Sequence, residues 1–221
     1  MEAMIKKYSL CATFIFLLSF FSSQPNAPKK PINLTLARNA VENYYECGQY
    51  DTDVCNVVQK AISHFKKIPI TKKSVVIFDI DDTILSNYCD EKSIAFGYIP
   101  KLSHEWILHA DAPQIPQTFE LYTYLVSRGF HIIFLSGRKH DEYDATIQNL
   151  QKEGFRVFDR LIVRSIDEES LTAQEFKTNR RKALIREGFA IVGTIGDQCS
   201  DLLGGYAEYG VKIPNYRYIL D

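Results

Sequence analysis

The run VVIFDIDDT, residues 75–83, constrains the fold of this chain more than any other stretch. Four apolar residues, mostly β-branched or aromatic, lead directly into three carboxylates within four positions. An uninterrupted apolar run of this length predicts a strand buried on both faces, as in a parallel sheet. In open α/β sheets, ligands bind in the crevice beyond the carboxyl ends of the strands. We therefore expect Asp79, Asp81 and Asp82 at the ligand-binding edge of such a sheet.

The closeness of the three carboxylates also restricts their surroundings. Two carboxylates about 4 Å apart repel by roughly 4 kcal/mol at an effective dielectric constant of about 20. The cluster is therefore stable only if it is solvated, protonated or neutralised by a cation, and an acidic strand end facing water is the plain alternative. A calcium-binding EF-hand loop is excluded, because Thr83 stands at its fifth position, Ile84 where Gly is required and Asp90 where the bidentate Glu belongs.

The composition is that of an ordinary globular protein. A length of 221 residues suits one large domain, or a domain with a small insertion. The hydrophobic content of 46% and the charged content of 24% are both usual. A net charge of −1, without a long basic run, argues against a nucleic-acid polymer as the partner.

The first residues have the layout of a secretory signal peptide. Two lysines precede an apolar run at residues 10–21, and a polar, Pro-containing stretch follows. The run is short for a membrane span, which takes about 20 apolar residues. We expect a signal peptide over residues 1–23, a secreted or periplasmic protein and no stable membrane association. A retained N-terminal anchor is the alternative, because neither Phe20 nor Phe21 suits the −3 position of a cleavage site.

Export would leave four cysteines, with Cys11 removed in the apolar run. They are Cys47, Cys55, Cys89 and Cys199. In an oxidising compartment they can pair, and Cys47 and Cys55 flank a turn-like stretch that makes them the best local candidates. The alternative is that all four are small buried hydrophobes. No CxxC or Cys/His spacing indicates a zinc site.

Helical and strand patterns alternate along the rest of the chain. Two helices, broken near Gly48, are expected within an N-terminal extension and linker at residues 24–73. Buried strands are expected at residues 75–78, 131–135, 160–164, 190–195 and 211–213, and helices at 117–128, 140–153 and 174–187. This alternation predicts an α/β, Rossmann-like parallel sheet with helices on both faces, over residues 74–221. Residues 88–117 follow the first strand without a strong period, and we expect a small cap there.

Several polar residues stand at expected strand ends and at one helix start. Ser136 and Gly137 follow the second strand, Lys177 opens a helix, and Asp197 and Asp201 follow the fourth strand. Each of these residues alone is weak evidence for a functional site, because a helical lysine is usually solvated and a serine at a strand end is common. The ordered set, together with the acidic cluster, indicates a functional site at one edge of the sheet.

This order resembles the motifs of the haloacid dehalogenase (HAD) superfamily, which are DxDxT, a Ser or Thr, a Lys, and a GDxxxD acidic pair. The match is closer to its acid phosphatase branch, which includes bacterial class C acid phosphatases and plant vegetative storage proteins. FDIDDTILSN at 78–87 resembles FDIDETLLSN, and KTNRRKAL at 177–184 resembles a K-x-x-R helix. Two motifs near the end of the sequence also match: GDQCSDL at 196–202 resembles GDQWSDL, and KIPN at 212–215 resembles KLPN. The resemblance covers about residues 35–221, with Cys199 in place of the usual Trp and Asp82 in place of the usual Glu.

The resemblance implies a Mg²⁺-dependent acid phosphatase that acts through an aspartyl-phosphate on small phosphomonoesters, with 5′-nucleotides among the expected substrates. In this reading Asp79 is the nucleophile and Asp81 the general acid and base. Mg²⁺ is held by the side chains of Asp79 and Asp197 and the backbone carbonyl of Asp81.

The remaining motif residues take supporting roles in the same reading. Lys177, Ser136 and Gly137 bind the phosphoryl group, and Asp201 orients Lys177 or a metal-bound water. A phosphotransferase that uses the same intermediate is one alternative. A non-enzymatic storage or binding protein is the other, and the presence of Asp79 argues against it.

Overall fold

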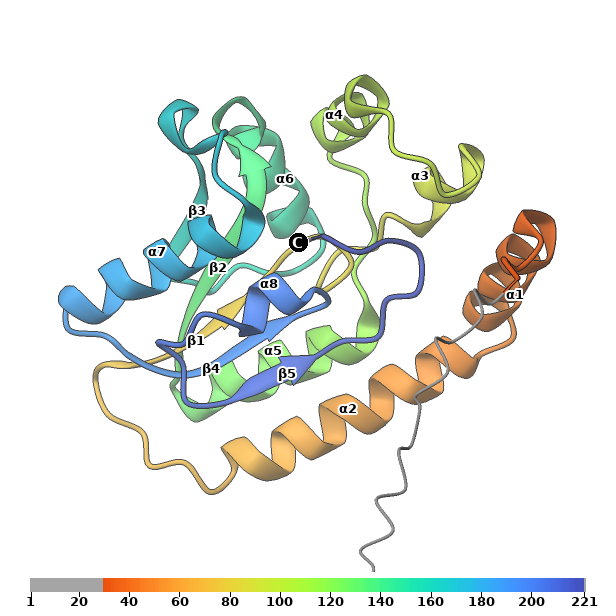
Figure 1. Ribbon diagram of the computed structural model, residues 1–221. Coiled ribbons are helices and arrows are strands. Elements are labelled where there is room, and N and C mark those ends of the chain that lie inside the picture. The colour runs from red at the N-terminus through yellow and green to blue at the C-terminus, as the bar shows by residue number, and fades with distance from the viewer. Residues whose placement is uncertain (1–29, 221) are drawn as a thin grey trace, which may run out of the picture. The chain divides into compact units, whose positions relative to one another are not determined.

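The computed structural model describes residues 30–220, and from Asn33 onward the chain forms one compact unit (Figure 1). The signal peptide expected at residues 1–23, and Cys11 with it, lie outside the described residues. Along residues 30–220, no helix combines the length and the apolar character needed to cross a membrane.

Within the described part of the chain, five parallel strands form one sheet in the order β3-β2-β1-β4-β5. The strands are β1 (Ser74–Phe78), β2 (His131–Lys139), β3 (Arg160–Arg164), β4 (Ala190–Gly196) and β5 (Gly210–Lys212). The chain builds β2 and β3 on one side of β1 and then returns to add β4 and β5 on the other. The strand order therefore reverses at β1, and the crevice at its carboxyl end is where α/β sheets bind ligands.

Helices cover both faces of this sheet (Figure 1). One face packs against α2 (Gln49–Phe65), α5 (Pro116–Arg128) and α6 (Tyr143–Lys152). On the other face, Phe176 and Leu184 of α7 (Ala173–Arg186) pack against Val75 and Ile77 of β1. All five residues of β1 are buried, which confirms the strand and the α/β fold expected from the sequence.

The segment between β1 and α5 contains two short helices, α3 (Tyr88–Ser93) and α4 (Pro100–His109). Figure 1 shows both beyond the carboxyl ends of the strands. Both lie within the described range, and none of their residues is fully buried. Because an amphipathic period arises from a buried face, these helices leave no strong period in the sequence. His104 of α4 shares a 2.8 Å hydrogen bond with Glu142, which joins this segment to the turn that follows β2.

The expected N-terminal pair of helices is confirmed as α1 (Leu34–Glu46) and α2. The chain turns between them at Gly48, whose φ of 86° is readily adopted by glycine. The buried residues of α2 recur at intervals of three or four and face the sheet: Tyr50, Val54, Val58, Ala61 and Phe65. Gly193 of β4 lets Phe65 approach closely, since a Cβ there would lie 2.5 Å from the Phe65 ring.

Two local expectations are corrected. The helix expected at 140–153 begins as a 3₁₀ turn, η1 (His140–Glu142), before α6. The structure also contradicts both interpretations of the cysteines. Cys47, Cys55, Cys89 and Cys199 are free, and each is exposed. Cys55 follows the buried Val54 on α2 and so falls outside the face that packs on the sheet.

The contact between Phe65 and the sheet gives a stability prediction. Phe65→Ala should lower the free energy of unfolding by about 3–5 kcal/mol, because it leaves a cavity against β4. Urea unfolding followed by circular dichroism measures the change. Ile185→Ala, at a residue that is 40% exposed, is the control and should change stability by less than about 0.5 kcal/mol. Equal effects of the two substitutions would contradict the packing described here.

Candidate active site

The site begins where β1 and β4 end side by side. Asp79 directly follows β1, and Asp197 directly follows β4. The two strands pair in parallel, so both carboxylates emerge at the same edge of the sheet. The backbone N–H of Asp79 donates to the carbonyl of Ile195 at 2.9 Å, so the backbone of Asp79 continues the pairing of β1 with β4.

Lys177 of α7 reaches into this edge and lies between two carboxylates. Its Nζ donates to Asp79 Oδ1 at 2.6 Å and also contacts Asp201 Oδ1. All three side chains are buried. Burial alone would lower the pKa of Lys177, but the charges of Asp201 and Asp79 outweigh it and raise that pKa. Lys177 therefore stays charged as the counter-ion of this part of the site.

Asp197 accepts hydrogen bonds on both carboxylate oxygens. Thr83 Oγ1 donates to Oδ1 at 3.1 Å, while Gln198 Nε2 and Asn215 Nδ2 donate to Oδ2 at 2.6 and 2.7 Å. Burial, with the charges of Asp201 and Asp82, nevertheless raises the pKa of Asp197 to about 6. Burial likewise raises the pKa of Asp79 well above its usual value, even though Lys177 acts in the other direction.

Asp79, Asp197 and Asp201 form the acidic group that can hold a cation. Each offers a carboxylate oxygen, and these oxygens lie within 4.8 Å of one another. The second oxygen of Asp201, Oδ2, accepts the backbone N–H of Gln198 at 2.8 Å, and this hydrogen bond holds the carboxylate in place. Gly196 has to lack a side chain here, since a Cβ would overlap the Asp201 carboxylate. Three buried carboxylates so close together favour a bound cation, and a divalent metal is what such oxygen ligands suit.

Asp81 turns away from this group and pairs with Arg138. The Arg138 Nε lies 3.0 and 3.2 Å from the two Asp81 oxygens, and its Nη2 lies 2.7 Å from Oδ1. Ser136 Oγ is 3.5 Å from Asp81 Oδ2 and accepts the backbone N–H of Arg138 at 3.1 Å. Burial would raise the pKa of Asp81, but Arg138 outweighs it and holds that pKa below its usual value.

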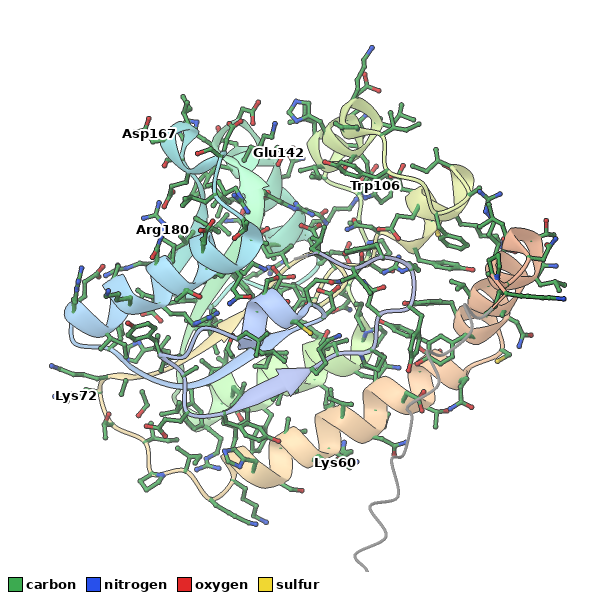
Figure 2. All side chains as sticks on the ribbon, viewed as in Figure 1. Lys60, Lys72, Trp106, Glu142, Asp167 and Arg180 are labelled. Carbon is green, nitrogen blue, oxygen red and sulfur yellow. The ribbon has the colours of Figure 1, made fainter. Side chains whose placement is uncertain are left out.

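A chain of hydrogen bonds connects Asp81 to the helices beyond the strand ends. Asn87 Nδ2 donates to Asp81 Oδ1 at 2.9 Å, and Trp106 Nε1 donates to Asn87 Oδ1 at 2.8 Å. Figure 2 shows Trp106 on the side of α4 toward the strand ends. The sequence had indicated neither Arg138 nor Asn87 as a site residue. The only signal for Arg138 was its place directly after Ser136-Gly137.

Asp82 has a third environment, separate from the other two carboxylates. It is buried and has a φ of 58°, and it contacts Arg217 and Tyr218 near the C-terminus. The expected acidic cluster therefore consists of three carboxylates with three different protein cations: Lys177, Arg138 and Arg217. Ser136 lies beside Asp81, whereas Gly137 is exposed.

Comparison with known proteins agrees with this arrangement. The profile of the HAD superfamily, subfamily IIIB (acid phosphatase), matches residues 22–220. The chain belongs to this family. It is therefore classed as a phosphoric monoester hydrolase of the acid phosphatase type, as the sequence motifs implied.

Individual relatives are similar over most of their length. A stem 28 kDa glycoprotein of Glycine max is 38% identical, over 82% of this chain and 74% of the relative. Acid phosphatase 1 of Solanum lycopersicum is 33% identical, over 81% and 73%. The class C acid phosphatase of Bacillus anthracis has the same fold, with a TM-score of 0.69 at 22% identity, covering 84% of this chain and 86% of the other.

The buried position of Lys177 in this acid phosphatase fold gives a second stability prediction. Lys177→Met should lower the free energy of unfolding by about 3–5 kcal/mol in metal-free buffer, because it leaves Asp79 and Asp201 without their cation. Lys182→Met, on an exposed position of the same helix, is the matched control and should have little effect. Urea titrations of both variants make the test, and a Lys177→Met protein as stable as the wild type would contradict the ion pairs described.

Proposed function

We propose that the protein is a secreted or periplasmic, Mg²⁺-dependent acid phosphatase that hydrolyses small phosphomonoesters, 5′-nucleotides among them. The observation that carries the proposal is the separation of two carboxylates. Asp79 is held by Lys177 within the acidic group, and Asp81 is held by Arg138 beside Ser136. A nucleophile and a proton-transfer group need such separate positions around one phosphorus atom. Export is supported by the layout of residues 1–23.

Asp79 and Asp197, with the backbone carbonyl of Asp81, are the proposed ligands of Mg²⁺. The fit is supported by the oxygen donors gathered at this edge, which are those that Mg²⁺ prefers. When bound, the ion would neutralise part of the carboxylate charge and polarise a phosphoryl oxygen.

The chain's own residues would then carry out a two-step displacement. An Asp79 oxygen attacks phosphorus and the ester oxygen leaves, while Asp81 gives it a proton. Because Arg138 lowers the pKa of Asp81, this proton transfer is favoured at acid pH. In the second step Asp81 takes a proton from the water that attacks the aspartyl-phosphate, and phosphate leaves with Asp79 regenerated. Lys177 offsets negative charge on the phosphoryl oxygens, and Ser136 and the Gly137 backbone bind the same group. Asp201 keeps Lys177 in position through their direct contact.

Residues 88–117 are proposed to act as a small cap on a phosphatase domain that spans 74–221, with residues 24–73 as its N-terminal extension and linker. The hydrogen bonds from Trp106 to Asn87 and from Asn87 to Asp81 support this role. They connect the cap directly to the proposed acid and base.

A storage role is the second candidate, because vegetative storage protein 1 of Arabidopsis thaliana is 30% identical over 80% of this chain. Storage requires no ordered nucleophile. The buried ion pair of Asp79 and Lys177 favours the enzymatic role, and a phosphate-release assay on the purified protein decides between the two.

Metal removal is the first test of the mechanism. Phosphate release should stop when the protein is treated with EDTA and return when Mg²⁺ is added, because the acidic group otherwise repels a phosphate dianion. The assay measures inorganic phosphate from several monoesters, including a 5′-nucleotide. Full activity in exhaustively chelated protein would overturn the proposed metal dependence.

Substitution of the two aspartates separates their roles. Asp79→Asn should abolish both turnover and covalent phosphorylation. Asp81→Asn should slow turnover of alkyl phosphates by about 10²- to 10⁴-fold, and by less for nitrophenyl phosphate, whose leaving group needs little protonation. Mass spectrometry of acid-quenched protein should detect a phosphorylated species in Asp81→Asn and none in Asp79→Asn.

Asp167→Asn is the control, because this residue is exposed on the η2 turn (Ile166–Glu168) after β3 (Figure 2) and takes no part in the hydrogen bonds and ion pairs described for the site. It should behave as the wild type does. Phosphorylation of the Asp79→Asn protein, or full activity of Asp81→Asn on alkyl phosphates, would refute the assignment of roles.

A further inference from the structure

Residues 215–220, the last that the structure describes, cross the site and are named here the C-terminal strap. Both ends of the strap hold Asp197. Asn215 Nδ2 donates to Asp197 Oδ2 at 2.7 Å. The backbone N–H of Leu220 donates to Gln198 Oε1 at 2.9 Å, and Gln198 in turn donates to Asp197. One carboxylate of the acidic group thus depends on two contacts with the strap.

At its middle the strap holds the loop that follows β1. Arg217 makes an ion pair with Asp82, and Tyr218 Oη donates to Asp82 Oδ2 at 2.8 Å. The Arg217 and Asp82 side chains are 2% and 1% exposed. Asp82 has φ 58° and is not a glycine, so its surroundings must hold it in this conformation. Because Asp82 directly follows Asp81, the strap fixes the backbone from which Asp81 projects.

Arg217 also contacts a partly buried carboxyl group on the cap. Its Nη1 lies 2.9 Å from Glu91 Oε2 of α3, and its guanidinium lies 4.9 Å from the ring centre of Tyr45 on α1. Burial and the charge of Asp82 raise the pKa of Glu91 to about 9, although Arg217 acts in the opposite direction. Glu91 is therefore uncharged near neutral pH, and Arg217 serves as the cation of Asp82.

From these contacts we infer that the C-terminal strap positions the active site, with Arg217 as the residue that fixes the loop of Asp81 and Asn215 as the residue that fixes Asp197. The inference rests on the roles proposed above for Asp81 and Asp197. None of the strap side chains needs to touch the substrate. Arg217 and Asn215 are positioning residues, and the cap, the first helix and the site meet at the Arg217 guanidinium.

The first test measures kcat and KM of Arg217→Met on an alkyl phosphate. A shifted Asp81 loop should lower kcat by about 10²-fold with KM little changed. Arg217→Lys keeps the positive charge but loses the planar guanidinium group, so its kcat should lie between those of Arg217→Met and the wild type. Arg186→Met, at an exposed position of α7, is the control and should leave kcat unchanged.

Folding is checked by urea unfolding and circular dichroism. If Arg217→Met does not fold, Tyr218→Phe replaces it, because this change removes only the hydroxyl that donates to Asp82. It should lower kcat while the protein unfolds near the wild-type urea concentration. A folded Arg217→Met or Tyr218→Phe protein with wild-type kcat would overturn the role of the strap. Loss of activity that only follows the unfolded fraction would do the same.

The second test needs no turnover. Calorimetry with Mg²⁺ should show that Asn215→Ala weakens binding by about 10- to 100-fold, as loss of a residue that orients a metal ligand does. Asn39→Ala, at an exposed residue of α1, is the control. Unchanged Mg²⁺ affinity in Asn215→Ala would refute this part of the inference. A wild-type protein that binds Mg²⁺ in this strap-dependent way but releases no phosphate would instead refute the proposed function.

Discussion

The structure depends on the neutralisation of three carboxylates that follow β1. Asp79, Asp81 and Asp82 are consecutive or nearly so, and each is paired with a cation from a different part of the chain. Removing one partner of a buried ion pair costs about 3–5 kcal/mol, since the remaining charge stays desolvated. The start of α7, the end of β2 and the C-terminal strap therefore all have to dock at this edge for the loop to be stable.

The order of the strands makes this docking possible. β1 lies in the middle of the sheet, with β2 on one side and β4 on the other. Arg138 comes from β2, so it reaches Asp81 from that side. Asp197 and Asp201 come from the β4 side, where Lys177 completes the group. The two proposed chemical roles are thus separated because they belong to opposite sides of the central strand.

Peripheral elements are coupled to the site through Arg217. Its guanidinium contacts the loop after β1, the cap helix α3 and the aromatic ring of Tyr45 on α1. Tyr45 also stacks on Tyr88 of the cap, with 5.0 Å between ring centres. The N-terminal helices, the cap and the C-terminal strap therefore share one buried charge, although they are far apart in the sequence.

The sequence alone determined the elements whose signal is local. The apolar runs at 75–78 and 131–135 predicted the buried strands, and the helical spacing of apolar residues predicted the two N-terminal helices, because burial imposes these periods. The cap helices were not predicted as helices, since they bury no complete face. The motifs also brought Asp79, Asp197, Asp201 and Lys177 to one edge, because parallel strands end together.

Only the tertiary structure decided which cation each carboxylate has. Arg138 lies 57 residues from Asp81, and Tyr218 lies 136 residues from Asp82. Nothing in the local sequence distinguishes these side chains from arginines and tyrosines on the surface. The sequence argument required only that the acidic cluster be neutralised. Which cation pairs with each carboxylate depends on the segments that the completed sheet brings within hydrogen-bond distance. Those segments are set by the whole fold and not by the local sequence.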